Sequence, residues 1–106
     1  MPTNQYHEPV NDLRDETRTF ARVIVSLIEE ADAINWYEQR TCVEKDDQAR
    51  EIMQHAQQEE MIHFGLDLAF LLRKKPTWEK VLKNILFKEG NLVELAESAE
   101  EEAVHE

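Results

Sequence analysis

Residues 41–47 read TCVEKDD, and this short polar stretch separates two long runs with apolar residues at helical spacing. The first run repeats at steps of three, four or seven residues, through Leu13, Phe20, Ile24, Leu27, Ala31 and Ile34. The second run contains Ala49, Ile52, Met53, Ala56, His63, Leu66, Ala69 and Phe70. Each run is typical of one helix face, and a short turn makes two long helices antiparallel neighbours. The stretch therefore predicts a helical hairpin.

The ends of the helices follow from turn and cap residues. We expect the first helix from about Val10 to about Arg40, and the second from an Asp46 or Asp47 N-cap to near Lys74. Pro76 cannot continue that second helix. A shorter third helix is expected after a Thr77 cap, closed by Gly90, with one more turn or two over residues 92–96. The prediction is all-α.

The domain organisation is predicted from length and composition. A chain of 106 residues has room for a single domain over 1–106, with a flexible N-terminal arm at 1–9 and an acidic tail at 97–106. The first helix would be on the order of 45 Å long, and so small a domain cannot cover such a rod with its own residues. We therefore expect a second chain, so that dimerisation completes a four-helix bundle.

Charge and cysteine usage exclude several classes of function. Twelve basic and twenty-three acidic residues give a net charge of -11, which repels nucleic acid and anionic membranes and attracts cations. The chain has no apolar run of membrane-spanning length, no signal-peptide pattern, and a single cysteine, Cys42. We therefore expect a cytoplasmic protein.

Acidic residues interrupt the apolar faces of both long helices. Glu30 lies on a stripe with Val23, Leu27, Ile34 and Tyr37. An ionised carboxylate buried without a partner costs several kcal/mol, so Glu30 needs a cation, a proton or hydrogen-bond donors.

The second helix places Glu60 and His63 three residues apart on one stripe. Side chains at this spacing lie roughly 5 to 6 Å apart at Cβ, so both can reach one metal ion. A Glu-x-x-His pair is common by chance in a Glu-rich helix. However, a hairpin sets Glu30 at a similar height, and one Glu plus one Glu-x-x-His is half of a di-iron carboxylate centre. A two-fold dimer would supply the other half.

The sequence resembles the encapsulated ferritins of the ferritin-like superfamily over nearly its whole length. The resemblance is carried by HEP at 7–9, IVSLIEEADAINWYEQR at 24–40, EEMIH at 59–63 and ILFKEG at 85–90. It implies that Glu30, Glu60 and His63 bind the two irons of a ferroxidase centre at a homodimer interface. It also implies a ring of ten subunits.

The resemblance implies further site residues and a partner. Glu29, Asp32 and Trp36 match the family's outer entry site, which could also bind calcium, although the family commonly has glutamate in place of Asp32. Tyr37 matches a tyrosine beside the catalytic centre. Family members are cargo of an encapsulin shell, docked by a C-terminal apolar peptide, and this sequence ends at VHE without that motif.

The function expected from these observations is oxidation of Fe(II) to Fe(III) by dioxygen, for iron storage and mineralisation inside an encapsulin nanocompartment. Glu60 would bridge the metals, and Glu30 and His63 would be terminal ligands. Asp67 would either accept the other ring proton of His63 or be a solvated helix aspartate. The alternatives are a metal-free helical oligomerisation module and a non-catalytic zinc or calcium clamp. Zinc would be distinguished by its lack of redox chemistry.

Overall fold

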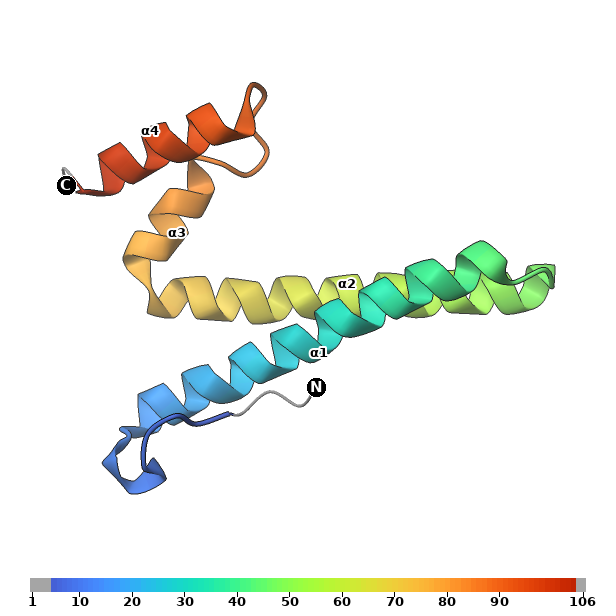
Figure 1. Cartoon of the computed structure of the whole chain (residues 1–106), viewed down its shortest axis with the longest axis horizontal. Helices are drawn as coiled ribbons and strands as arrows, with labels where there is room; N and C mark the ends of the chain where they lie inside the picture. Colours follow the sequence, from blue (N-terminus) through green and yellow to red (C-terminus); the bar gives the residue numbers. More distant parts are fainter. Residues whose placement is uncertain (1–4, 105–106) are drawn as a thin grey trace. The chain divides into compact units, whose positions relative to one another are not determined.

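The computed structural model describes residues 5–104, and these form helices without any strand (Figure 1). A short 3-10 helix, η1, covers Val10–Asp12. The α-helices are α1 (Asp15–Val43), α2 (Asp47–Lys74), α3 (Pro76–Lys83) and α4 (Leu92–Val104). The all-α prediction is confirmed. The described chain forms two compact units that divide between Leu71 and Leu72.

The two long helices α1 and α2 pack as an antiparallel hairpin, as the sequence predicts (Figure 1). α1 begins later than expected because the chain first turns through η1. The carbonyl of Val10 accepts hydrogen bonds from the Leu13 N–H, at 3.1 Å, and from the Arg18 guanidinium. Arg14 is extended and precedes the helix. The predicted helix start at Val10 is therefore wrong by five residues.

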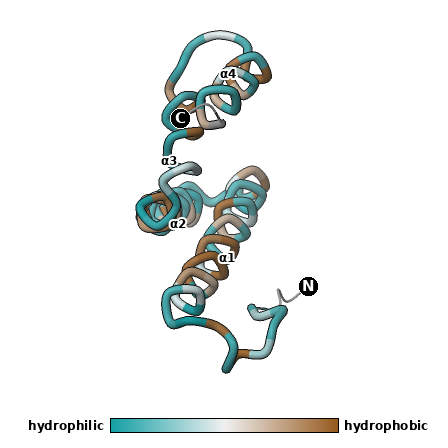
Figure 2. The backbone as a smooth tube through the Cα atoms, turned by 90° about the vertical axis from the view of Figure 1, so that its left-hand side faces the viewer, coloured by the Kyte–Doolittle hydropathy of each residue, from teal (hydrophilic) through white to brown (hydrophobic). Residues whose placement is uncertain are grey.

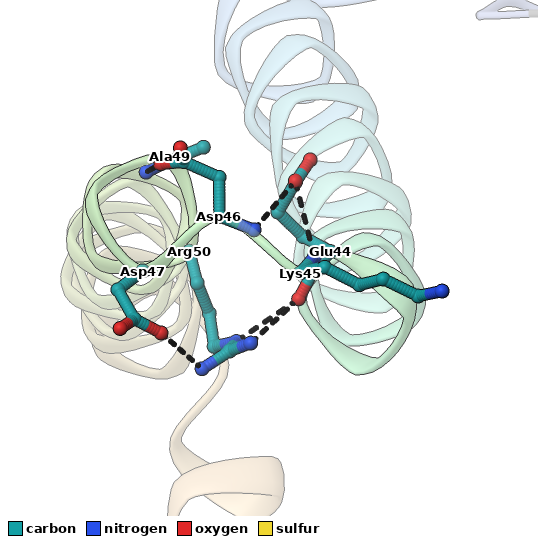
Figure 3. A network of polar contacts seen from close by, with 6 residues as sticks. All are labelled: Glu44, Lys45, Asp46, Asp47, Ala49 and Arg50. Atoms are coloured by element: carbon teal, nitrogen blue, oxygen red, sulfur yellow. Dashed lines mark hydrogen bonds and ion pairs between the residues drawn. The ribbon is translucent and has the colours of Figure 1, made fainter.

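Side chains of the turn between α1 and α2 cap the C-terminal end of α1 (Figure 3). The last carbonyls of a helix lack partners within the helix. Arg50 supplies donors, because its Nη2 and Nε lie 2.7 and 3.2 Å from the Glu44 carbonyl oxygen. The Glu44 carboxylate accepts from the N–H groups of Lys45 and Asp46, each at 3.1 Å. These contacts reverse the chain direction in three residues.

Asp46 caps the start of α2, as the sequence predicts. Its Oδ1 accepts the Ala49 N–H at 2.8 Å, which satisfies one of the free donors of the first turn. Asp47, the other predicted cap, begins the helix and accepts from Arg50 Nη1 at 3.3 Å (Figure 3).

One side chain of α2 fixes its register against α1. Gln57 Nε2 donates to the Ile34 carbonyl oxygen at 3.1 Å and to Glu38 Oε1 at 3.0 Å. Because a main-chain carbonyl and a side chain one turn later are both engaged, α2 cannot slide along α1 without breaking two hydrogen bonds.

The hairpin leaves much apolar surface in water. Among residues 5–103, Leu71 and Ala99 are the buried residues. Leu27 and Ile34 on α1 are half-buried, and Leu66 on α2 is exposed. Figure 2 shows long apolar stretches along α1. A hairpin with so little buried core fits the expectation that a second chain covers it.

The second unit contains α3 and α4, which pack against each other. The predicted Thr77 cap is wrong. α3 starts at Pro76, whose missing N–H costs nothing in the first turn, and the residue before it, Lys75, is the N-cap. α3 ends at Lys83, and Gly90, with φ 114°, lies in the loop that follows instead of closing the helix.

The acidic stretch 97–106, expected to be a tail, is helical as far as Val104. Asn91 caps the start of α4, because Asn91 Oδ1 accepts the Glu94 N–H at 3.1 Å. Asn84 Nδ2 donates to Glu102 Oε2 at 2.9 Å and ties α4 to the end of α3. In the expected arm at 1–9, residues 5–9 form no helix or strand. The remaining parts of the predicted arm and tail, 1–4 and 105–106, lie outside the described residues.

The prediction of one domain over 1–106 stays a prediction. None of the helices within residues 5–104 combines the length and apolarity that a bilayer crossing requires.

Candidate metal centre

The structure brings two of the three predicted metal ligands together from opposite helices. His63 Nδ1 on α2 lies 3.9 Å from Glu30 Oε1 on α1. The Glu30 side chain is 15% exposed, whereas that of His63 is 58% exposed. The imidazole therefore lies at the edge of the hairpin, and the carboxylate lies between the helices.

Glu60, the third predicted ligand, lies one turn before His63 on α2 and is half-buried. Its negative charge acts on Glu30, where it helps to raise the pKa. Within residues 5–104, however, the structure shows no group of three or more His, Cys, Asp or Glu side chains that could hold a metal ion. One chain therefore presents parts of a ligand set on one region of the hairpin, and the complete set of Glu30, Glu60 and His63 stays a prediction.

The pKa of Glu30 is raised from its ordinary value of 4.5 to about 7. Burial is the largest cause, because it disfavours the charged form. A hydrogen bond with the Asp67 carboxyl group and the Asp67 charge raise the pKa further, the nearby His63 lowers it, and Glu60 raises it. The hairpin therefore favours the protonated form of Glu30.

Two carboxyl oxygens in this region are buried without hydrogen-bond partners, Glu30 Oε2 and Asp67 Oδ2. Two ionised carboxylates cannot hydrogen-bond to each other, so their contact requires a shared proton or a cation. A buried polar atom without a partner is costly. Carboxylate oxygens and an imidazole nitrogen are ligand types that suit iron.

Asp67 was expected to orient His63, and this role stays a prediction. Its charge acts on Glu30, where it helps to raise the pKa. The sequence contains a signal for this effect. Asp67 follows His63 by four residues and Glu60 by seven, so all three share one face of α2. Gln57, three residues before Glu60, was also missed, although it joins the two helices beside the centre.

The predicted outer site lies on the exposed side of α1. Glu29 and Asp32 are exposed, and the Trp36 side chain is 51% exposed. No described group of acidic side chains there is arranged to hold a metal, so calcium has no support from the structure. The outer site stays a prediction.

Tyr37 directly follows Trp36 and is half-buried. The Arg40 guanidinium lies 5.3 Å from the centre of its ring, a cation–π distance. The Tyr37 carbonyl accepts from Thr41 Oγ1 at 2.9 Å. Its predicted place beside a catalytic centre is not tested by these contacts.

Comparisons with known proteins agree with the resemblance seen in the sequence. The model of the EncFtn-like family matches residues 5–89. A "Ferritin-like protein" of Thermotoga maritima is 40% identical over 94 residues, which are 89% of this chain and 82% of that protein. An "Encapsulated ferritin-like protein" of Rhodospirillum rubrum is 37% identical over 101 residues, 93% of this chain and 72% of that protein.

A solved structure shares the fold. The crystal structure of a protein from Nitrosomonas europaea superposes with a TM-score of 0.80 at 37% sequence identity, and the match covers 84% of this chain and 98% of that one. The family model, the relatives and this structure agree, so the chain belongs to the EncFtn-like family of encapsulated ferritins.

Proposed function

We propose that this chain is a ferroxidase subunit, a finer statement of the ferritin-like, iron-related function that its family supports. Two copies would complete a centre that oxidises Fe(II) to Fe(III). The observation that carries the proposal is the approach of Glu30 and His63 from opposite helices, with one Glu30 oxygen buried and unpaired. A cation is the partner that this oxygen lacks.

A second copy of the chain is the simplest source of the missing ligands. A two-fold axis brings the same surface of both chains together, so it would place Glu30, Glu60 and His63 opposite their own copies. Apolar side chains beside these residues on α2, Met61, Ile62 and Leu66, are exposed and would be covered by the same contact. A dimer would therefore finish both the ligand set and the apolar core.

The residues of this chain would bind the iron and hold its charge. Carboxylate oxygens favour the higher oxidation state, and His63 supplies a neutral nitrogen ligand. Each Fe(II) that becomes Fe(III) releases one electron, and dioxygen accepts the electrons. Binding of a cation at Glu30 would replace the proton that the raised pKa places there.

The cellular setting of the proposal follows from charge and from the relatives. A net charge of -11 concentrates cations near the protein, and the exposed Glu29, Asp32 and Trp36 would meet Fe(II) first. One relative is named an encapsulated ferritin-like protein. By analogy, we propose that this chain works inside an encapsulin compartment in the cytoplasm, as dimers arranged in a ring of ten subunits.

Anaerobic loading with Fe(II), followed by air, tests the proposal. The rate of Fe(III) absorbance and the native mass are compared for wild type, Glu60→Ala and His63→Ala. His55→Ala is the matched control, because His55 also lies on α2 beside a glutamate but its side chain is 74% exposed. We expect the first two variants to lose oxidation and the control to keep it.

Equal oxidation rates in all four proteins would contradict the ferroxidase proposal. If the native mass of wild type is the same with and without Fe(II), and wild type takes up no oxygen, the metal-free oligomerisation module is favoured. Metal-dependent assembly without Fe(III) formation would favour a structural clamp.

A further inference from the structure

Three arginines form a basic stripe at the start of α1, in a chain whose net charge is -11. Arg14, Arg18 and Arg22 follow one another at steps of four, so they share one side of the helix. Arg14 and Arg22 are exposed, and Arg18 has a buried Nε without a hydrogen-bond partner. Over the described residues of the first unit, 5–71, no carboxylate forms an ion pair with any of these three residues, which we call the arginine stripe.

Helix α4 of the second unit carries the opposite charge. Glu94, Glu97 and Glu101 are exposed and recur at steps of three and four, so they also share one side of their helix. We call them the glutamate stripe. Ala99, on the other side of α4, is buried where the helix packs against α3. The sequence of α4 contains no lysine or arginine that could offset the glutamates.

Each stripe lies at the unfavourable end of its own helix. The N-terminal end of a helix is positive and the C-terminal end is negative. The arginine stripe begins at the N-cap of α1, whereas Glu101 lies in the last turn of α4, which has no basic residue. Like charges at steps of three or four along a helix also repel one another. Contact between the two stripes would therefore stabilise both helices.

We propose that the arginine stripe of one copy of the chain docks against the glutamate stripe of a second copy. The arginine stripe extends over eight residue steps and the glutamate stripe over seven, so each is about 10 to 12 Å long. The two stripes thus match in length and are opposite in charge. Because each copy presents both stripes, a two-fold dimer forms the contact twice.

A second copy is the occupant because chains with a net charge of -11 repel one another, so their association needs places where opposite charges meet. Exposed apolar side chains also lie beside both stripes. Val10, whose carbonyl the Arg18 guanidinium engages, is 42% exposed, and Leu92 and Val93 at the start of α4 are each 66% exposed. The contact would cover them. It involves neither Glu30 nor His63, so this inference goes beyond the proposed function and does not rest on it.

Sedimentation at low and at high salt, with and without Co(II), measures association of the copies. One variant, Arg14→Glu/Arg22→Glu, reverses the exposed arginines, and the other, Glu97→Lys/Glu101→Lys, reverses two glutamates. All four side chains are exposed, and helical content is recorded to verify folding. At low salt, each variant should associate at least about 10-fold more weakly than wild type, because like charges then face each other. The difference from wild type should shrink at high salt, which screens charges.

Mixing the two variants distinguishes contact between copies from contact within one chain. In a mixed pair every stripe again meets its opposite charge, so an equimolar mixture should regain association. Contact within one chain would instead be restored only when all four substitutions are combined. Lys45→Glu/Lys88→Glu is the matched control, because it makes the same change in net charge at exposed lysines outside both stripes. It should stay within about 3-fold of wild type.

Four results would overturn the inference. If wild type is monomeric under every condition, no second copy docks. If the two reversed variants associate as wild type does, the stripes do not meet. If their mixture associates no better than either variant alone, the stripes do not meet between copies. If the lysine control weakens association as much as the arginine variant, the effect is one of net charge.

Discussion

Helix α2 carries two histidine–glutamate contacts of nearly equal length. His63 Nδ1 lies 3.9 Å from Glu30 Oε1, and His55 Nε2 lies 3.8 Å from Glu59 Oε1. The first contact joins two helices, and its carboxylate is 15% exposed, whereas the second lies within one helix and its carboxylate is 53% exposed. Distance alone therefore does not distinguish a candidate site. Burial does, because only a carboxylate removed from water needs a new partner.

The largest change in the free energy of unfolding is expected from Glu30→Gln in the metal-free protein. The folded state favours the protonated form of Glu30, because its pKa is raised from 4.5 to about 7. The free energy of unfolding of wild type should therefore fall as pH rises from about 4.5 to about 7, and stay low above that. At pH 8, Glu30→Gln should be more stable than wild type by at most about 3 kcal/mol.

Urea unfolding at pH 5 and at pH 8 measures this difference. Glu29→Gln is the control, because it removes the same charge from an exposed neighbour on α1. If Glu29→Gln gains as much as Glu30→Gln at pH 8, general repulsion among acids is the cause, and burial of Glu30 is not.

The next largest effect is expected in the thermal stabilisation by metal, which should differ between the His55 and His63 variants. A ligand that binds only the folded state stabilises it by about 2.7 kcal/mol when its free concentration is 100 times its Kd. Anaerobic Co(II) should therefore raise the thermal midpoint of wild type and of His55→Ala, and leave His63→Ala unchanged. Equal shifts in both histidine variants would mean that the metal binds elsewhere.

The hairpin could be predicted from the sequence because its signals are local. Helical periodicity on either side of TCVEKDD and the Asp46 cap depend on residues a few positions apart. The helix ends were less predictable, because they depend on longer contacts. The guanidinium of Arg18 engages the Val10 carbonyl eight residues earlier, and this contact delays the start of α1.

In the candidate site too, local signals could be predicted from the sequence and contacts between the helices could not. Glu30, Glu60 and His63 could be found from polar residues that interrupt apolar stripes, and the resemblance supports them. The effect of Asp67 on the pKa of Glu30 could not be found in this way, because helical spacing places Asp67 on the same face of α2 as Glu60 and His63 but does not say which residue of α1 its charge acts on. That choice depends on the register between the helices, which Gln57 helps to set.

A smaller effect is expected from Gln57→Ala, which tests that register. The variant loses hydrogen bonds to the Ile34 carbonyl and the Glu38 carboxylate, and should lower the free energy of unfolding by about 1 kcal/mol. Gln58→Ala, at an exposed neighbour, should change it much less. Amide hydrogen exchange in the middle of α1 should also quicken in Gln57→Ala. An unchanged exchange rate would show that packing alone holds the register.

The smallest effect is expected from His55→Ala. Both side chains of the His55–Glu59 contact are more than half exposed, so water and salt screen the pair. Removal of the imidazole should change the free energy of unfolding by less than about 0.5 kcal/mol, and the higher helix propensity of alanine offsets part of that loss. Urea unfolding with and without added salt measures it. A loss above about 1 kcal/mol would mean that an exposed contact contributes as much as the Gln57 hydrogen bonds, and burial would no longer explain why the two histidine–glutamate contacts differ.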